Sequence, residues 1–233
     1  MLALVVATGF ALAHWVSIAT ESRKGILITK PMVMLPLIGW LMLETWQKGF
    51  EGSGTFAILL PFLLALLFSL AGDVFLLWSE RFFLPGLISF MLAHICYIIG
   101  FRPLIPPAGG FLTAGSLFFV LVLVGSCLYK IIARSLRLRG RVRMLVPLAA
   151  YSAVLSLMLF TAGTRFLQPE WELRAALLAA VGAVLFYMSD IMNAWVRFVQ
   201  PISHHQLKIM ITYHIAQLSL TASIMLHTGG SWM

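Results

Sequence analysis

Asp73 and Asp190 are the two aspartates of this chain, and each lies inside a long apolar stretch. A carboxylate at the centre of a membrane helix costs about 3 kcal/mol on insertion scales, so it is rarely accidental. Such a group normally faces a protein interior or a water-filled cavity and marks a functional site. One carboxylate in each half of the chain indicates either paired acid–base chemistry or a path for protons or ions.

Two buried carboxyl groups that lie near one another can hold a single proton near neutral pH, because desolvation and the second charge both oppose ionisation. One group then donates a proton while the other accepts one or polarises water. The structural alternative is that each aspartate cross-links helices through backbone groups or tyrosine hydroxyls. We predict that both residues are catalytic.

Four further polar residues occur in pairs with helical spacing. His94 and Tyr97 are three residues apart, and Tyr213 and Gln217 are four apart, so each pair shares one face of a helix. Either pair could orient a carboxylate or a substrate oxygen, although interhelical hydrogen bonding would use the same spacing.

Metal and serine chemistry are disfavoured by the spacing of their usual residues. The sequence contains no HExxH, HxxxH or CxxC pattern and no GxSxG elbow. We therefore expect no metal and no cofactor, and we expect His204 and His205 to be solvated loop residues. Zinc ligands can still come from separate helices, and the candidates are His94, His204, His205, His214 and the two aspartates.

The composition defines the surroundings of these residues. Hydrophobic residues make up 61% of the chain and charged residues 10%, with a mean hydropathy of +0.98, whereas a soluble domain carries about 25% charged residues. We predict an all-α polytopic membrane protein with one integral domain over residues 1–233. The charges that give a net +8 lie mostly at the ends of apolar segments, which argues against a nucleic-acid partner.

Eight segments are long and apolar enough to cross a bilayer, which takes about 20 residues in a helix. The odd connections hold 12 lysines and arginines and the even ones 4, so we expect the odd connections in the cytoplasm and both termini outside. Short loops without tails suggest a bacterial inner membrane. The predicted spans are 2–19, 31–48, 55–78, 82–101, 111–131, 143–163, 173–196 and 207–227.

Two details concern the ends of these spans. The first segment lacks the basic start of a signal peptide, so we expect it to remain as a helix. The six residues of the densest basic cluster are expected to form a cytoplasmic loop against anionic lipid: Lys130, Arg134, Arg137, Arg139, Arg141 and Arg143.

The spans place the polar residues in one layer. Asp73 and Asp190 each lie five residues before a tryptophan near the cytoplasmic end of a helix, about 7–8 Å inside that end. Lys30, Tyr151, Tyr213 and Gln217 fall at comparable depth, with His94 and Tyr97 deeper.

The outer halves of the helices hold few polar groups, and Glu44 is expected to be solvated there. A carrier needs polar groups near the midplane and access from both faces, so this distribution favours a lipid enzyme open to one leaflet. A Gly-Asp or Ser-Asp pair followed by polar residues on the next helix occurs in both halves, which predicts a parallel four-plus-four repeat.

Several stretches together form a recognisable pattern: GDVFLL at 72–77, the segment 83–97 that ends in H-x-x-Y, Ser189-Asp190, Tyr213 with Gln217, Lys30-Pro31 and Tyr151. This pattern resembles the YhhN/TMEM86 family of lysoplasmalogenases. The resemblance covers nearly the whole chain and includes the count of eight helices. His214 departs from it, because we would expect a second aromatic residue there in this family.

The resemblance implies hydrolysis of the vinyl ether bond of lysoplasmalogens to a fatty aldehyde and glycerophosphoethanolamine or glycerophosphocholine. Protonation at carbon gives an oxocarbenium ion that water captures, so the reaction needs an acid and an oriented water but no metal. Asp73 and Asp190 would divide the acid and base roles. The expected substrate contacts are Lys30, His94, Tyr97, Tyr151, Tyr213 and Gln217, with Arg81 or Lys208 as further phosphate contacts.

The expected partners are therefore a lysophospholipid substrate, bilayer lipids, and water as co-substrate, and the oligomeric state is left open. Two other classes of function remain. One is a small proton-coupled transporter that uses the intramembrane aspartate pair. The other is a zinc-dependent lipid amidase or intramembrane protease, which the absent ligand spacing disfavours.

Overall fold

The computed structural model describes residues 2–50, 54–78, 80–102 and 107–229. Eight long helices occupy this part of the chain, and each is apolar and long enough to cross a membrane. The predicted fold class, an all-α bundle of eight spanning helices, is thereby confirmed. The helices are α1 (Leu2–Ala19), α2 (Arg23–Phe50), α3 (Phe56–Trp78), α4 (Phe83–Gly100), α5 (Phe111–Leu138), α6 (Leu145–Gly163), α7 (Leu173–Phe198) and α8 (His205–His227).

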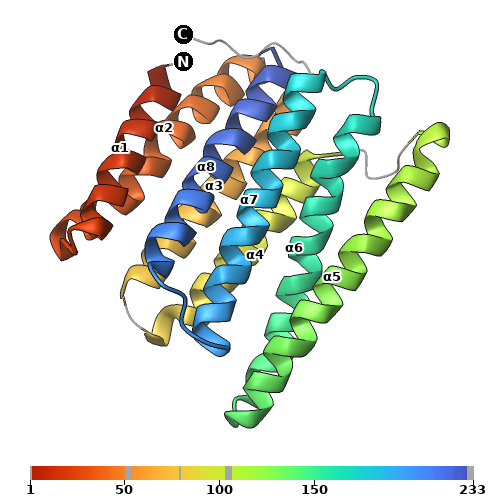
Figure 1. Cartoon of the computed structure of the whole chain (residues 1–233). Coiled ribbons are helices and arrows are strands. Elements are labelled where there is room, and N and C mark those ends of the chain that lie inside the picture. The colour runs from red at the N-terminus through yellow and green to blue at the C-terminus, as the bar shows by residue number, and fades with distance from the viewer. Residues whose placement is uncertain (1, 51–53, 79, 103–106, 230–233) are drawn as a thin grey trace.

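Four short 3-10 turns lie beside these helices and turn the chain between them. They are Glu80–Phe82, Ala108–Gly110, Val142–Met144 and Thr164–Leu167. The connections that follow the odd helices all lie at one end of the bundle, which we call the odd end (Figure 1). The two termini lie at the opposite end (Figure 1).

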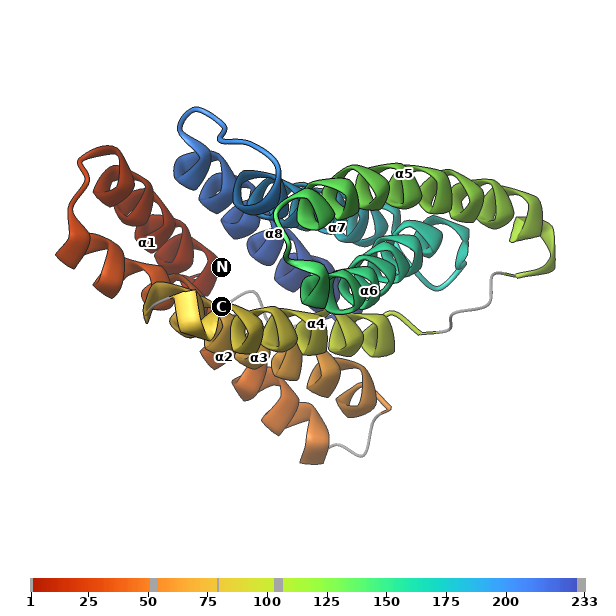
Figure 2. The same cartoon turned by 90° about the horizontal axis from the view of Figure 1, so that it is seen from below.

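The helices form antiparallel hairpins around α8, which is the most enclosed span, while α5 lies at the edge of the bundle and is almost entirely exposed (Figures 1 and 2). The α3–α4 and α7–α8 hairpins pack closely because small residues allow their backbones to approach. A Cβ added to Gly182 on α7 would lie 2.8 Å from Cγ of Leu220 and 3.1 Å from the carbonyl oxygen of Ala216 on α8. The four-plus-four repeat stays a prediction.

Two predicted helix ends were wrong. The second helix begins at Arg23 rather than at residue 31, and Pro31 and Pro36 lie inside it. Lys30 is therefore two turns inside α2 and is buried. The fifth helix continues to Leu138, beyond the predicted end at residue 131, so Arg134 and Arg137 are helical rather than in a loop, as is Lys130 within the predicted span. These three side chains are exposed on the last turns of α5.

The expectation for the other end of the bundle was also wrong. Glu44 is 2% exposed rather than solvated, and Arg165 is fully buried. The guanidinium carbon of Arg165 lies 5.7 Å from the ring centre of Trp171, and that ring stacks on His227 with centroids 3.9 Å apart. Polar groups therefore occur at both ends of the bundle.

Candidate active site

Three helices bring their polar side chains together around Asp190. The hydroxyl of Tyr151 on α6 donates a hydrogen bond to Oδ2 of Asp190 on α7 at 2.5 Å. Nε2 of His94 on α4 lies 3.0 Å from the same oxygen and 3.2 Å from the Tyr151 hydroxyl. The Asp190 side chain is 13% exposed, while that of His94 is fully buried. His94 and Tyr151 thus hold one carboxyl oxygen and leave the other for a ligand.

Asp73 has a different set of partners. Its Oδ1 lies 3.2 Å from Nζ of Lys30, and its Oδ2 accepts a hydrogen bond from the Tyr213 hydroxyl at 2.8 Å. The side chains of Asp73 and Lys30 are 1% and 8% exposed. This group joins α2, α3 and α8, and its carboxylate is compensated by a neighbouring cation.

A third pair lies deeper in the bundle. Tyr97 donates a hydrogen bond to Oε1 of Gln217 at 2.6 Å, and both residues are buried. The Tyr97 ring packs against Phe62 with centroids 5.4 Å apart. This pair cross-links α4 and α8, which is the structural alternative that its spacing allowed.

The eight predicted site residues therefore fall into three groups by their closest contacts, and Tyr213 also interacts with Gln217, which links the Asp73 group to the Tyr97 pair. In the described part of the chain, no hydrogen bond or ion pair joins Asp73 to Asp190. The ring of Phe186 lies between their partners, with its centroid 4.6 Å from that of His94 and 5.4 Å from that of Tyr213. The two carboxyl groups can thus have separate roles.

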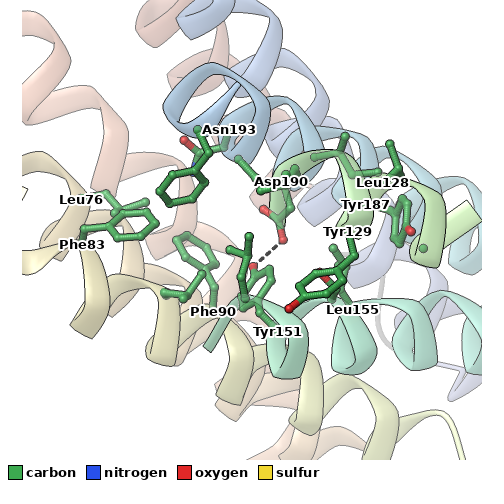
Figure 3. Close-up of a pocket in the computed structure, with 18 residues that line it drawn as sticks. Leu76, Phe83, Phe90, Leu128, Tyr129, Tyr151, Leu155, Tyr187, Asp190 and Asn193 are labelled. Carbon is green, nitrogen blue, oxygen red and sulfur yellow. Dashed lines mark hydrogen bonds between the residues drawn. The ribbon is translucent and has the colours of Figure 1, made fainter. Parts of the chain in front are cut away.

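Asp190 and Tyr151 line a pocket formed mainly by α4, α5, α6 and α7 (Figure 3). This apolar pocket is narrow: its enclosed volume is about 60 Å³, and the figure rises to about 720 Å³ only when all the space out to open solvent is counted. Most of its wall is leucine, isoleucine and phenylalanine, such as Phe83, Phe90 and Leu155. In the described part of the chain, Oδ1 of Asp190 has no hydrogen-bond partner. A carboxyl oxygen without a protein partner therefore adjoins a narrow apolar space.

A second pocket lies at the odd end of the bundle, between α1, α2, α7 and α8. This basic pocket has a volume of about 1440 Å³ including its open mouth. Its cationic groups are Lys30, Arg141 and Arg197, and His14 and His205 lie beside them. Leu76 and Asn193 line both pockets, so the apolar and basic pockets adjoin.

Arg81 and Lys208, proposed from sequence as phosphate contacts, line neither pocket. Arg197 does line the basic pocket, with its guanidinium carbon 3.9 Å from the ring centre of Phe83. His205 is half-buried at the start of α8 and lines the basic pocket, so the expectation of a solvated loop residue was wrong for it. His204 is exposed, as expected.

Sequence reasoning missed three contributors, His14, Trp15 and Asn193. His14 on α1 lies 2.9 Å from the Thr29 hydroxyl, and Trp15 donates to Nδ1 of His214 at 3.0 Å. These contacts fill the wall at His214, and nothing in the pattern of the first helix indicated them. Asn193 was also missed, although its position three residues after Asp190 places it on the same helix face.

The described residues contain no group of three or more His, Cys, Asp or Glu side chains that could hold a metal ion. The arrangement instead supports proton transfer: a carboxyl group with two fixed partners, at the wall of an apolar pocket, beside a cationic pocket. A membrane-spanning fold with an apolar pocket beside a basic pocket offers complementary surfaces to an amphiphilic molecule that carries a negative charge.

The chain belongs to the YhhN family, whose sequence profile matches residues 25–224. It is 34% identical over 161 residues to the human lysoplasmalogenase TMEM86B, covering 68% of this chain and 61% of that protein. It is 29% identical over 240 residues to a lysoplasmalogenase of Mycobacterium bovis, covering 94% of this chain and 84% of that protein. The match to the human relative thus spans less than two thirds of its length. No solved structure matches significantly.

Proposed function

We propose that this protein is a lysoplasmalogenase, an ether hydrolase that cleaves the vinyl ether bond of lysoplasmalogens. One observation carries the proposal: the carboxyl group of Asp190 opens into an apolar pocket that adjoins a basic pocket. A lysoplasmalogen has the same division, because its vinyl ether joins a hydrocarbon chain to a glycerol that bears a phosphodiester. The names of the relatives support the same substrate class.

The lipid would lie with its chain in the apolar pocket and its phosphodiester in the basic pocket. Lys30, Arg141 and Arg197 supply the positive charge for the phosphodiester. The vinyl ether would then lie beside Asp190 near the boundary of the two pockets. Because the basic pocket lies at the odd end of the bundle, the lipid would enter from the membrane leaflet on that side.

Asp190 acts as the general acid in this proposal. Its Oδ1 transfers a proton to the vinyl carbon next to the alkyl chain, and the adjacent carbon becomes an oxocarbenium ion bonded to the ether oxygen. The Asp190 carboxylate then accepts a proton from the water that attacks this ion. The resulting hemiacetal collapses to a fatty aldehyde and the glycerol hydroxyl, so one water is consumed and no redox change occurs.

Tyr151 and His94 stabilise the negative charge that develops on Asp190 as it loses its proton. Preformed donors directed at a developing charge are among the strongest sources of catalysis. Tyr151 donates to Oδ2, and His94 donates to it when its ring proton lies on Nε2. Asp73 is enclosed and paired with Lys30, so we assign it the role of positioning that cation.

The test is aldehyde release from lysoplasmenylethanolamine by the purified protein in detergent. Wild type should release aldehyde with or without a chelator, and Asp190→Asn should reduce the rate by at least about 100-fold, the lower range for a lost acid–base group. Glu172→Gln, at an exposed position before α7, is the matched control and should keep the wild-type rate.

A wild-type protein that releases no aldehyde would overturn the proposal, and proton-coupled transport would then be measured in proteoliposomes. Activity lost to the chelator would instead indicate a metal hydrolase. Full activity in Asp190→Asn would remove Asp190 from the reaction.

A further inference from the structure

Asn193 lies beside Asp190 on α7 but has no role in the reaction proposed above. It lies on α7, three residues after Asp190 and four before Arg197. These spacings place the three side chains on one face of the helix. The rise of the helix separates Asp190 from Asn193 by about 4.5 Å and Asn193 from Arg197 by about 6 Å along the axis.

The surroundings of Asn193 indicate a ligand-binding role. It lines both pockets, and the other residue common to them, Leu76, is apolar. Asn193 is half-buried, and its amide has no hydrogen-bond partner in the described part of the chain. Figure 3 shows it at the rim of the apolar pocket, on the same side as Asp190. A carboxamide offers two donors and one acceptor to a ligand in this position.

We propose that Asn193 binds the free C2 hydroxyl of the glycerol and so selects lysolipids over lipids with a second chain. The proposal rests on the proposed function. The order of side chains along α7 is carboxyl, carboxamide and guanidinium, and the order of groups along the lipid is vinyl ether, C2 hydroxyl and phosphodiester. With the vinyl ether at Asp190 and the phosphodiester at Arg197, the C2 hydroxyl falls at Asn193.

The contact between Asn193 and the C2 hydroxyl would also explain why a lipid with a second chain is a poorer substrate than a lysolipid. An ester at C2 removes the hydroxyl proton and adds a second chain at the boundary between the two pockets. The acceptor oxygen of Asn193 would then lose its donor. A site built to hydrogen-bond a hydroxyl discriminates against an analogue that lacks it, because the polar groups of the site are left unpaired.

The experiment compares two substrates that differ only at C2: lysoplasmenylethanolamine and its 2-deoxy analogue, in which hydrogen replaces the hydroxyl. A neutral hydrogen bond contributes about 0.5–1.5 kcal/mol, so the wild-type kcat/KM should fall about 2- to 12-fold for the 2-deoxy lipid. Asn193→Leu, of similar size, should lower kcat/KM for the natural lipid by the same factor. It should treat the two lipids alike and match wild type on the 2-deoxy lipid.

Asn193→Ala gives a second, smaller variant with the same expectation. The proposal is overturned if wild type does not distinguish the two lipids, or if either variant still distinguishes them. It is also overturned if both variants are inactive on both lipids, because a hydroxyl ligand is not essential for turnover. Absence of aldehyde from wild type with either lipid would overturn the proposed function itself, so the two failures are distinguishable.

Discussion

At the scale of single residues, Tyr151 and Tyr97 each donate a hydrogen bond to a side chain on another helix, but the two bonds have different roles. Tyr151 donates to Asp190 at the wall of the apolar pocket, whereas Tyr97 donates to Gln217 in the enclosed interior. Tyr151→Phe removes a donor to a carboxyl group that becomes charged in the reaction. A hydrogen bond to a charged group contributes about 1.5–3 kcal/mol, so kcat should fall about 10- to 150-fold.

Tyr97→Phe is the matched variant for that prediction. It leaves Oε1 of Gln217 buried without its donor, which costs about 1–3 kcal/mol of stability. The midpoint of thermal unfolding in detergent should therefore fall while kcat changes little. The assignment of tasks is contradicted if Tyr97→Phe loses turnover and Tyr151→Phe keeps it.

The buried pair of Lys30 and Asp73 makes a prediction about stability. Removing one partner leaves an uncompensated charge in the interior, which costs about 3–5 kcal/mol. Asp73→Asn alone and Lys30→Met alone should each lower the midpoint of unfolding. The double variant should be more stable than the sum of the two losses predicts, because neither charge then remains unpaired. Additive losses would show that the 3.2 Å contact does not couple the two residues.

The sequence predicted most of the residues of the site, but it did not predict which of them contact one another. Intramembrane aspartates and helical spacing identified six of the eight side chains, and depth in the membrane together with the family resemblance added Lys30 and Tyr151. Spacing along a helix gives the face of a residue but not its partner on another helix. For that reason the position of Phe186 against both His94 and Tyr213, and the contact of Trp15 with His214, could not be predicted.

At the scale of elements, close approach of helices α7 and α8 depends on Gly182. Gly182→Ala would place its Cβ against Leu220 and the backbone of Ala216. Overpacking of this kind costs about 1–3 kcal/mol, more than the about 1 kcal/mol that alanine gains over glycine in a helix. Gly182→Ala should therefore lower the midpoint of thermal unfolding.

Gly115 on α5 is the control for this substitution. A Cβ there meets no atom within 4 Å, so Gly115→Ala should leave stability unchanged or raise it by up to about 1 kcal/mol. Equal effects of the two alanine variants would mean that the α7–α8 contact can relax around a methyl group.

The ends of the elements were predicted less well than their number. Apolar length identified all eight helices, because a membrane span must bury its backbone in a helix. Pro31 was interpreted as a helix start because proline favours the first turn, yet membrane helices also accept proline in their interior. The basic residues at the end of α5 were assigned to a loop, although charged side chains on an exposed helix face can reach water.

At the scale of the whole molecule, both pockets place the proposed chemistry toward the odd end. The basic pocket lies at that end, and Asp190 is eight residues before the end of α7, about 12 Å along the helix axis. Buried polar groups also lie at the other end, including Arg165 and Glu44. Polar residues occur at both ends, so their distribution alone does not distinguish a lipid enzyme from a carrier. The position of the two pockets toward the odd end is the feature that favours a lipid enzyme.

The side of the membrane that the odd end faces can be measured with single cysteines. Lysine and arginine are concentrated in the odd connections, and positive residues are retained in the cytoplasm. In a Cys96→Ser, Cys127→Ser background, Ser203→Cys lies exposed between α7 and α8, and Glu172→Cys lies exposed before α7. A membrane-impermeant maleimide added to intact cells should label Glu172→Cys and not Ser203→Cys, and permeabilisation should make both reactive. The reverse pattern would place the basic pocket in the outer leaflet, and the substrate would then be drawn from outside the cell.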